Sequence, residues 1–371
     1  MLVICYASTT EIYLICLEFL RDMIRVVIVG LGNCSSSFIQ GIEFYKNEQE
    51  TKGYVRREIG NYLIKDVQVV GAIDVDKRLI GKDVSEAIFS GSNTAEKFSE
   101  VPNYNVQVVK GPVLDGVAEH MHNSFQVDDS QPPVDIAAYL KEVEAEFVIC
   151  YLPVGSEKAA KFYAEEALKA GVGFINAIPV FICSTPEWSN KFKEAGLVCA
   201  GDDIKSQFGA TYLNRVLVES LMYRGFNIDN LYQLNVGGNT DFENMIDESR
   251  LQSKRISKTS AVSTLFKEGN EPALRIGPSD YVPHLKDAKI CYINVNGTQF
   301  GNQKFELELK LKVEDSPNSA GVMLDVVRLA KVAKEKGLTG NIPVVSAFGF
   351  KSPADKMSET DILRKIDDFL A

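Results

Sequence analysis

The stretch Ile24-Arg25-Val26-Val27-Ile28-Val29-Gly30-Leu31-Gly32 decides the fold. Its first part is rich in β-branched residues, which predicts a buried strand that ends at a turn with two glycines. A helix is expected from Ser35 to Tyr45, and a second strand from Val67 to Ile73 runs into Asp74. Strand, glycine turn, helix, strand and acid, in this order, are typical of a βαβ unit that binds a dinucleotide.

The turn indicates what this unit would bind. Gly30 and Gly32 would let a pyrophosphate approach the backbone at the start of the helix. The third position of the motif is Ser35 instead of glycine, so an ordinary tight turn is the alternative, but the flanking strand and helix favour the cofactor. Asp74 would accept hydrogen bonds from the adenosine ribose and repel a 2′-phosphate, which favours NAD over NADP.

The next part of the chain continues the same pattern. A helix is expected from Ser156 to Ala170, with Ser156 as its N-cap and Gly171 as its stop. The segment from Tyr151 to Ser156 would close a strand at the carboxyl edge of the sheet, where ligands of open α/β sheets bind. Further apolar strands, typical of a parallel sheet covered on both faces, are expected at Val106–Val109, Phe147–Tyr151, Gly173–Asn176 and Leu197–Ala200.

The pattern changes after about residue 225. The segment Leu231–Val236 predicts a strand, which leads into Gly237–Asp241. Two further segments, Cys291–Val295 and Phe305–Val313, alternate between apolar and polar residues around a turn with two glycines, as an antiparallel pair with one wet face does. A long amphipathic helix from Ala320 to Lys336 restores the α/β pattern.

We therefore predict an α/β fold, with a Rossmann-type doubly wound parallel sheet and an inserted α+β domain. The Rossmann domain would comprise residues 23–229 and 316–371, and the insertion residues 230–315. Residues 1–22 are expected to be an extension outside the fold. They have neither the basic start nor the cleavage pattern of a signal peptide, and two acidic residues argue against a membrane span.

Composition excludes some classes of function. A formal net charge of −10 argues against a general binder of nucleic acid or anionic membranes. Seven dispersed cysteines without a CxxC pair are typical of reduced thiols in a cytoplasmic protein. Because the chain has only 3 histidines, we expect acid–base chemistry near neutral pH to depend on lysines. Burial and nearby charge can lower the pKa of a lysine.

Two polar segments are candidates for chemistry. Gly201–Thr211 follows an apolar strand and could hold a phosphate, but a solvent-exposed capping loop explains that segment equally well. Lys254 and Lys258 would share one face of a helix, which alone is more typical of a solvated basic face than of an anion pocket. Lys289 and Lys351 lie beside expected strand or loop boundaries and carry no signal by themselves.

Taken together, the chain from Met23 to its C-terminus closely resembles the myo-inositol-1-phosphate synthase family, in its archaeal and actinobacterial form. The resemblance lies in strings that occur in order: Tyr151–Glu157 (YLPVGSE), Asn176–Ile182 (NAIPVFI), Gly201–Gln207 (GDDIKSQ), Leu234–Asn239 (LNVGGN), Ser257–Thr259 (SKT) and Asp315–Gly321 (DSPNSAG). Several strings in order are far more specific than a glycine motif. They also overturn the solvated-face interpretation of the two helical lysines.

The resemblance implies a redox-neutral isomerisation of D-glucose 6-phosphate to myo-inositol 1-phosphate, which is 1D-myo-inositol 3-phosphate in the other numbering. NAD⁺ would oxidise C5, an enolate would form at C6, C6 would attack the C1 aldehyde, and the ketone would then be reduced. A homotetramer held together by the inserted domain is also implied. The inserted domain would therefore be both catalytic and oligomeric.

The resemblance also implies a set of site residues. The catalytic group would be Lys254, Lys258, Lys289, Lys351, Asp241 and Asp315. The cofactor would be bound by Gly30, Gly32, Asn33, Cys34, Asp74, Tyr151, Pro153, Gly155, Ser156 and Asp203. The substrate would be bound by Ser206, Gln207, Thr211, Asn235 and Asn239.

Within the catalytic group, Lys258 would bind the phosphate and substrate oxygens, and Lys254 and Lys289 would stabilise the carbonyl oxygen and the enolate. Lys351 would handle proton transfer near C5, and the two aspartates would orient the ammonium groups. A small shift in register would exchange Lys289 for Lys286, and we prefer Lys289 because it directly precedes a strand.

Two alternatives and one open point remain. The chain could be an NAD-dependent dehydrogenase of the homoserine or aldehyde dehydrogenase type, or a nucleotide-sensing regulatory protein without catalysis. Metal use varies in the family, and the sequence has no His/Cys cluster with zinc spacing. Any divalent cation is therefore expected to be held by phosphate, water and carboxylates.

Overall fold

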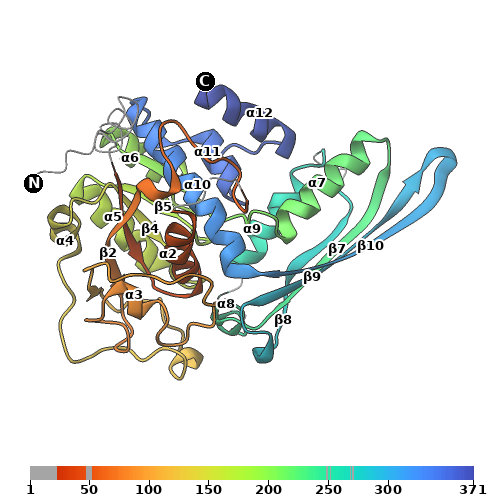
Figure 1. Cartoon of the computed structure of the whole chain (residues 1–371). Helices are drawn as coiled ribbons and strands as arrows, with labels where there is room; N and C mark the ends of the chain where they lie inside the picture. Colours follow the sequence, from red (N-terminus) through yellow and green to blue (C-terminus); the bar gives the residue numbers. More distant parts are fainter. Residues whose placement is uncertain (1–22, 47–51, 248–249, 251, 268, 270) are drawn as a thin grey trace, which may run out of the picture.

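The larger sheet is parallel and doubly wound, as predicted (Figure 1). A computed structural model of the chain describes residues 23–46, 52–247, 250, 252–267, 269 and 271–371, without the side chains of 252–255, so the predicted extension 1–22 lies outside the described residues. The sheet has seven strands in the order β11-β6-β5-β4-β1-β2-β3. Their bounds are β1 Ile24–Val29, β2 Val67–Asp74, β3 Val108–Lys110, β4 Phe147–Cys150, β5 Gly173–Asn176, β6 Val198–Gly201 and β11 Gly340–Asn341.

Helices cover both faces of this sheet because each strand is apolar on both sides. One buried cluster joins one face to α2, α10, α11 and α12, whose bounds are Asn33–Tyr45, Asp315–Glu335, Pro343–Gly349 and Glu359–Leu370. The other cluster joins the opposite face to α4, α5 and α6, whose bounds are Ile136–Glu142, Glu157–Ala170 and Pro186–Glu194. A short helix, α3, spans Val84–Ala87. The strand order reverses between β1 and β4, which is where such sheets bind ligands.

The start of one predicted helix differs from the structure, and the start of another agrees with it. Helix α2 begins at Asn33, two residues before Ser35, with Gly32 as its N-cap residue. Ser156 is the N-cap residue of α5, as predicted, but its side chain makes no capping hydrogen bond. Its hydroxyl donates to the carbonyl oxygen of Pro153 at 2.5 Å. The carboxylate of Asp115 accepts instead from the amides of Lys158 and Ala159, at 2.7 and 2.9 Å.

The second sheet has the strand order β10-β9-β7-β8. The bounds are β7 Asn227–Gly237, β8 Ala273–Tyr281, β9 Ala288–Gln299 and β10 Gln303–Glu314. The antiparallel pairing of β9 with β10 confirms the predicted ladder. Strand β8 was not predicted, because Gly277 and Pro278 interrupt its apolar pattern, and it pairs in parallel with β7.

Helices α7 (Ala210–Tyr223) and α9 (Gln252–Ser263) pack on one face of this second sheet through a shared apolar cluster. Helix α7 packs on the second sheet, although its residues fall within the predicted Rossmann domain. The proposed domain boundary at residue 229 stays a prediction. Helix α10 begins at Asp315, directly after β10 and five residues before the predicted start at Ala320. No helix in the described part of the chain is long and apolar enough to cross a membrane.

The first glycine of the turn is required by the close approach of two strands. Gly30 has φ +90°, and a Cβ there would lie 2.8 Å from the carbonyl oxygen of Tyr151, just after β4. A Cβ on Gly32, by contrast, would have no neighbour within 4 Å. The two glycines therefore serve different purposes, the first in packing and the second at an open surface.

We predict that Gly30→Ala lowers the free energy of unfolding by about 1–3 kcal/mol, the usual cost of a non-glycine residue held at positive φ. Gly32→Ala should leave stability nearly unchanged, because its φ is −84° and space is open around it. Urea unfolding followed by circular dichroism measures both. Equal loss of stability in the two variants would contradict the assignment.

Candidate active site

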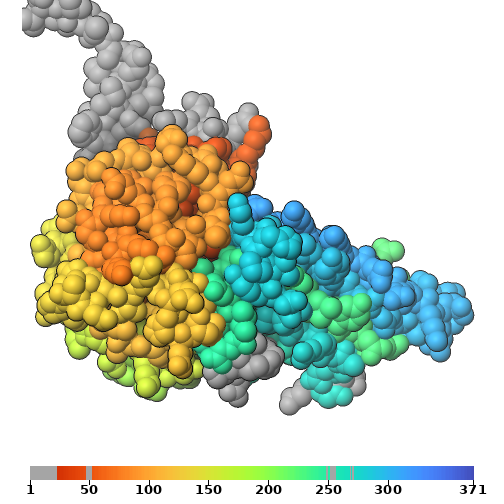
Figure 2. Space-filling view, turned by 90° about the horizontal axis from the view of Figure 1, so that it is seen from below, coloured from red at the N-terminus to blue at the C-terminus, as the bar shows by residue number. Residues whose placement is uncertain are grey.

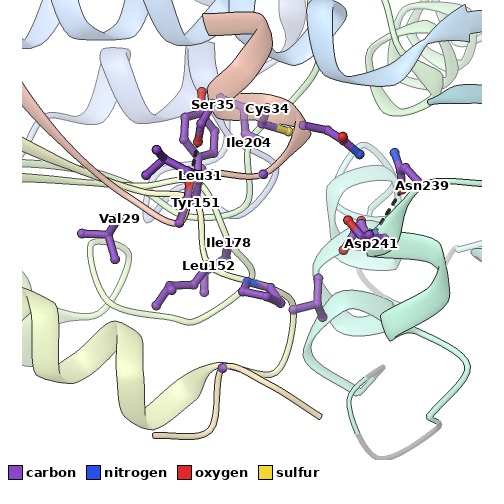
Figure 3. A pocket seen from close by; sticks show the side chains of 18 of the residues that line it. Val29, Leu31, Cys34, Ser35, Tyr151, Leu152, Ile178, Ile204, Asn239 and Asp241 are labelled. Atoms are coloured by element: carbon purple, nitrogen blue, oxygen red, sulfur yellow. Dashed lines mark hydrogen bonds between the residues drawn. The ribbon is translucent and has the colours of Figure 1, made fainter. Parts of the chain in front are cut away.

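A large pocket opens at the carboxyl edge of the parallel sheet, between the glycine turn and the second sheet. Figure 3 shows Leu31, Cys34 and Tyr151 on one side of it and Asn239 and Asp241 on the other. The predicted site residues that line this pocket are Gly30, Gly32, Asn33, Cys34, Asp74, Tyr151, Pro153, Asp203, Ser206, Asn239, Asp241, Lys258, Lys289, Asp315 and Lys351. Residues far apart in the sequence thus converge on one pocket.

The end of the pocket near the turn has the features of a dinucleotide site. Helix α2 starts there with no side-chain cap and no acidic residue in its first turn, so its amides are available to an anion. The open space beside Gly32 lets a ligand approach the backbone. These residues fit the pyrophosphate of NAD.

Asp74 lies at the end of β2 in the position expected for a ribose ligand. Its carboxylate accepts from the amide of Leu31 at 2.7 Å and from the amides of Val75 and Asp76 at 2.7 and 2.9 Å. Burial raises the pKa of Asp74, although these amides oppose the rise. The three bonds fix the carboxylate beside the turn, where it faces the pocket.

The opposite end of the pocket holds lysines from different elements. Lys289, at the start of β9, places Nζ 2.8 Å from Oδ1 of Asp315, the first residue of α10. Lys351 places Nζ 2.9 Å from Oδ1 of Asp203. Lys258 lies on α9 and is only 4% exposed. The structure therefore places Lys289 in the pocket, whereas Lys286 is exposed and is not among the residues that line it.

Lys254 lies one helical turn before Lys258 on α9, as predicted from their spacing. The side chain of Lys254 is outside the described residues, so its role stays a prediction.

Electrostatics keep Lys289 charged. Burial lowers the pKa of Lys289, but the negative charge and hydrogen bond of Asp315 and the charge of Asp241 outweigh burial, so the pKa is raised above its usual value. Its ammonium group is therefore a hydrogen-bond donor at neutral pH and not a base.

A buried carboxylate that the sequence analysis missed connects this region. Asp287 is 1% exposed and accepts from the amide of Ser316 at 3.0 Å and from its hydroxyl at 2.7 Å. It also accepts from Nδ2 of Asn239 at 3.1 Å. Burial, and then the charge of Asp315, raise the pKa of Asp287 to about 6. Its position directly before a buried strand was the available signal.

Asp203 is also joined to a residue that was missed. It has φ +64°, and its Oδ2 accepts from the hydroxyl of Ser257 at 2.6 Å. The hydroxyl of Ser352 donates to that of Ser257 at 2.8 Å. Asp203 thus fixes Lys351 and, through Ser257, the helix that carries Lys258.

Five other predicted residues with described side chains are not among those that line the pocket: Gly155, Ser156, Gln207, Thr211 and Asn235. Asn235 is buried in the second sheet and donates to the carbonyl oxygen of Gly277 at 2.8 Å. The backbone amide of Gln207 donates to the backbone carbonyl oxygen of Asn318 at 2.9 Å, which ties the loop of Gln207 to α10. Thr211 is buried in the first turn of α7. The roles given to these five residues stay predictions.

Metal ligation has little support from side chains alone. Within the described part of the chain, no three His, Cys, Asp or Glu residues are grouped as metal ligands. The carboxylates of Asp74, Asp203 and Asp315 are instead engaged with lysines and backbone amides.

Comparisons with known proteins identify the family of the chain. The family described as myo-inositol-1-phosphate synthase matches residues 209–316. The inositol-3-phosphate synthase of Mycolicibacterium smegmatis is 46% identical over 355 residues, which cover 94% of this chain and 98% of that protein. The one from Corynebacterium glutamicum is 42% identical over 356 residues, with 94% and 98% covered.

Solved structures share the fold. A myo-inositol-1-phosphate synthase-related protein from Thermotoga maritima superposes with a TM-score of 0.77 at 25% identity, and covers 94% of this chain and 98% of its own. An inositol-3-phosphate synthase from Caenorhabditis elegans gives 0.76 at 16% identity, with 95% and 86% covered, and supports the fold alone. Given identities above 40% along nearly the whole of both actinobacterial relatives, this chain belongs to the inositol-3-phosphate synthase family.

Proposed function

We propose that this enzyme converts D-glucose 6-phosphate to myo-inositol 1-phosphate (1D-myo-inositol 3-phosphate) with NAD as a recycled cofactor. The observation that carries the proposal is the convergence of Lys258, Lys289 and Lys351, from three separate segments, on a pocket that begins at the glycine turn. A simple dehydrogenase needs one proton acceptor, whereas three proton transfers and a developing oxyanion call for several cationic groups.

The proposed reaction is an isomerisation, so substrate and product have the same atoms. In the open-chain sugar, C5 is oxidised to a ketone, which acidifies the C6 protons. Loss of one of them gives an enolate, C6 attacks the C1 aldehyde, and the ketone at C5 is reduced. Bound NAD⁺ would supply the oxidation at C5 and, as NADH, the final reduction. The uncapped start of α2, the space beside Gly32 and the carboxylate of Asp74 support this cofactor.

Lys289 is proposed to stabilise the oxygen at C5 while negative charge develops on it. Its raised pKa supports this role, because a permanently protonated donor stabilises an oxyanion without having to be protonated first. Asp315 would hold the ammonium group in place through the 2.8 Å contact. Lys254 is proposed to act on the same oxygen from α9.

Lys351 is proposed to exchange the proton of the C5 hydroxyl. Its Nζ lies 2.9 Å from Oδ1 of Asp203, so a carboxylate stands next to the ammonium group and can orient it or share its proton. Lys258 and Ser206 line the same pocket, and we propose that they bind the substrate phosphate. Because the described carboxylates form no metal cluster, we assign no step to a divalent cation.

Self-association is proposed through the outer face of the second sheet. Leu234 on β7 pairs with Tyr292 on β9, and these side chains are 38% and 41% exposed. Exposed apolar side chains that are neighbours on a sheet favour contact with another subunit. We expect a homotetramer, which multi-angle light scattering would measure. A cytoplasmic location is proposed because the five described cysteines are unpaired thiols.

The direct test is to incubate the purified protein with glucose 6-phosphate and a catalytic amount of NAD⁺. We expect inositol phosphate to form over many turnovers with no net rise in absorbance at 340 nm. NADH that accumulates in step with substrate loss would instead favour the dehydrogenase alternative. Intact function of Lys258→Ala would favour the regulatory alternative.

A pair of neighbouring lysines tests the pocket assignment. Lys289→Ala should lower kcat by about 100-fold or more, which is the usual effect of removing one oxyanion donor. Lys286→Ala should retain near wild-type kcat, because Lys286 is exposed and is not among the residues that line the pocket. Steady-state assays of inositol phosphate formation distinguish the two. The reverse order would show that the register is wrong.

Asp315→Asn tests the electrostatic role. This change removes the largest influence that raises the Lys289 pKa, so the effect of burial remains and the pKa falls. Activity that needs the ammonium form is lost as pH rises through that pKa, so the alkaline limb of the kcat/KM profile should move to lower pH. Asp280→Asn, on the exposed side of β8, is the matched control. An unmoved limb in Asp315→Asn would contradict the role.

A further inference from the structure

Two loops of the parallel-sheet region are tied to the segment that follows β7 by side chains outside the lysine group. Oγ of Ser124 donates to both carboxylate oxygens of Glu243, at 2.8 and 2.9 Å. Nδ2 of Asn244 donates to the carbonyl oxygen of Val154 at 2.8 Å. Glu243 and Asn244 both belong to α8 (Thr240–Asn244), which also carries Asp241.

Arg250 joins the same two loops more extensively. Its Nε donates to the carbonyl oxygen of Val154 at 3.0 Å, and its Nη2 donates to those of Asp115 and Gly116, at 3.1 and 3.4 Å. A guanidinium group suits this task because its donors form a rigid fork. We call the contacts of Glu243, Asn244 and Arg250 with these loops the clasp.

The loop after β4 leaves room for the side chain of Arg250. Gly155 has φ +86°, and a Cβ there would lie 2.8 Å from Nε of Arg250. Asp115 contributes twice, because its carbonyl oxygen accepts from Arg250 while its carboxylate caps α5. The clasp therefore attaches to a loop that is itself fixed to the parallel-sheet region.

The clasped loops form one wall of the pocket. Residues Pro112, Val113, Leu114, Gly116 and Val117 line it from the loop after β3, and Leu152, Pro153 and Val154 line it from the loop after β4. The glycine turn lies beside the second of these loops, because Gly30 closely approaches Tyr151 and Leu152. In Figure 2, the yellow surface of the loop after β3 abuts the green surface around residue 240. Opening this wall requires the clasp to break.

The proposed reaction gives such a wall a purpose. Oxidation of C5 moves a hydride to the cofactor and one proton to the protein, and the same two electrons must return to C5 after ring closure. A reduced cofactor that leaves early yields one NADH and one keto sugar phosphate, and the isomerisation stops. The enzyme therefore needs slow release of NADH, which an ordinary dehydrogenase does not.

We propose that Glu243, Asn244 and Arg250 are positioning residues that hold the loops after β3 and β4 closed over the cofactor, and so retain NADH between the two hydride transfers. The inference rests on the proposed function. It assigns these residues no contact with the reacting atoms. Their effect is on how long the cofactor stays bound.

The test combines cofactor binding with a leakage assay. Dissociation constants for NAD⁺ and NADH are measured by calorimetry and fluorescence. Turnover of glucose 6-phosphate is then run with lactate dehydrogenase and pyruvate, so that each NADH that escapes reduces one pyruvate to lactate. The ratio of lactate to inositol phosphate counts escapes per completed turnover. Arg250→Ala, Arg250→Lys and Ser124→Ala are compared with Glu119→Ala, which changes an exposed carboxylate of the same loop.

Arg250→Ala should weaken NADH binding by about tenfold or more, as expected when carbonyl acceptors lose a charged donor, and should raise the lactate ratio with an unchanged Tm. Arg250→Lys should restore part of the binding, Ser124→Ala should show a smaller rise, and Glu119→Ala should match wild type. Wild-type binding and lactate ratios in both Arg250→Ala and Ser124→Ala would overturn the proposal.

Two other outcomes are also decisive. If Arg250→Ala does not fold, Ser124→Ala decides alone, because it removes one hydroxyl and leaves the carboxylate of Glu243 in place. If the wild type makes no inositol phosphate, the proposed function fails. The clasp is then judged by the NADH dissociation constants only, and unchanged constants would overturn it.

Discussion

The active-site region depends on one buried carboxylate. Asp287 lies where β9 begins and holds the starts of two helices, that of α8 through its N-cap residue Asn239 and that of α10 through Ser316. Lys289 follows Asp287 by two residues. Asp241 and Asp315 lie within two residues of Asn239 and Ser316, the residues that this carboxylate contacts. A charge buried in this way is tolerable because several donors surround it. Three elements that carry reactive groups are thereby fixed relative to one another.

Pairing of buried lysines with aspartates explains how an acidic protein can act on a sugar phosphate. The chain has a formal net charge of −10, but two pocket lysines are each paired with one aspartate. Such pairing lets ammonium groups stay charged in a buried place, where an unpaired one would tend to lose its proton. An arriving phosphate then meets cations that are already oriented, so little reorganisation is needed. Long-range attraction contributes less than local geometry.

Much of the parallel sheet could be predicted because its signals are local. The β-branched run before Gly30 and the acid at Asp74 specify the first unit, and Gly171 does end α5 with φ +78°. The β9 and β10 ladder was predictable for the same reason. By contrast, β8 contains Gly277 and Pro278, and only pairing with β7 makes it a strand. Its contacts are distant in sequence and leave no local pattern.

The site was predictable in part for a similar reason. The family resemblance pointed to the lysines and aspartates that line the pocket, but the burial of Asp287 depends on α8 and α10, which come from either side of it in the chain. The capping of α5 by Asp115 was missed because the two are about forty residues apart, and Ser156 offered a plausible local cap. Local propensity favoured the nearer residue, and tertiary contact decided otherwise.

The parallel pairing of β7 with β8 has a consequence for how the chain folds. Parallel neighbours cannot be joined by a tight turn, so residues 238–272 form a crossover, and this crossover includes α8 and α9. The helix that bears Lys258 is therefore ordered by a pairing that must first close a long loop, which is a slow event in folding. The lysines proposed to act in catalysis are thus expected to come together late in folding, once β7 and β8 have paired.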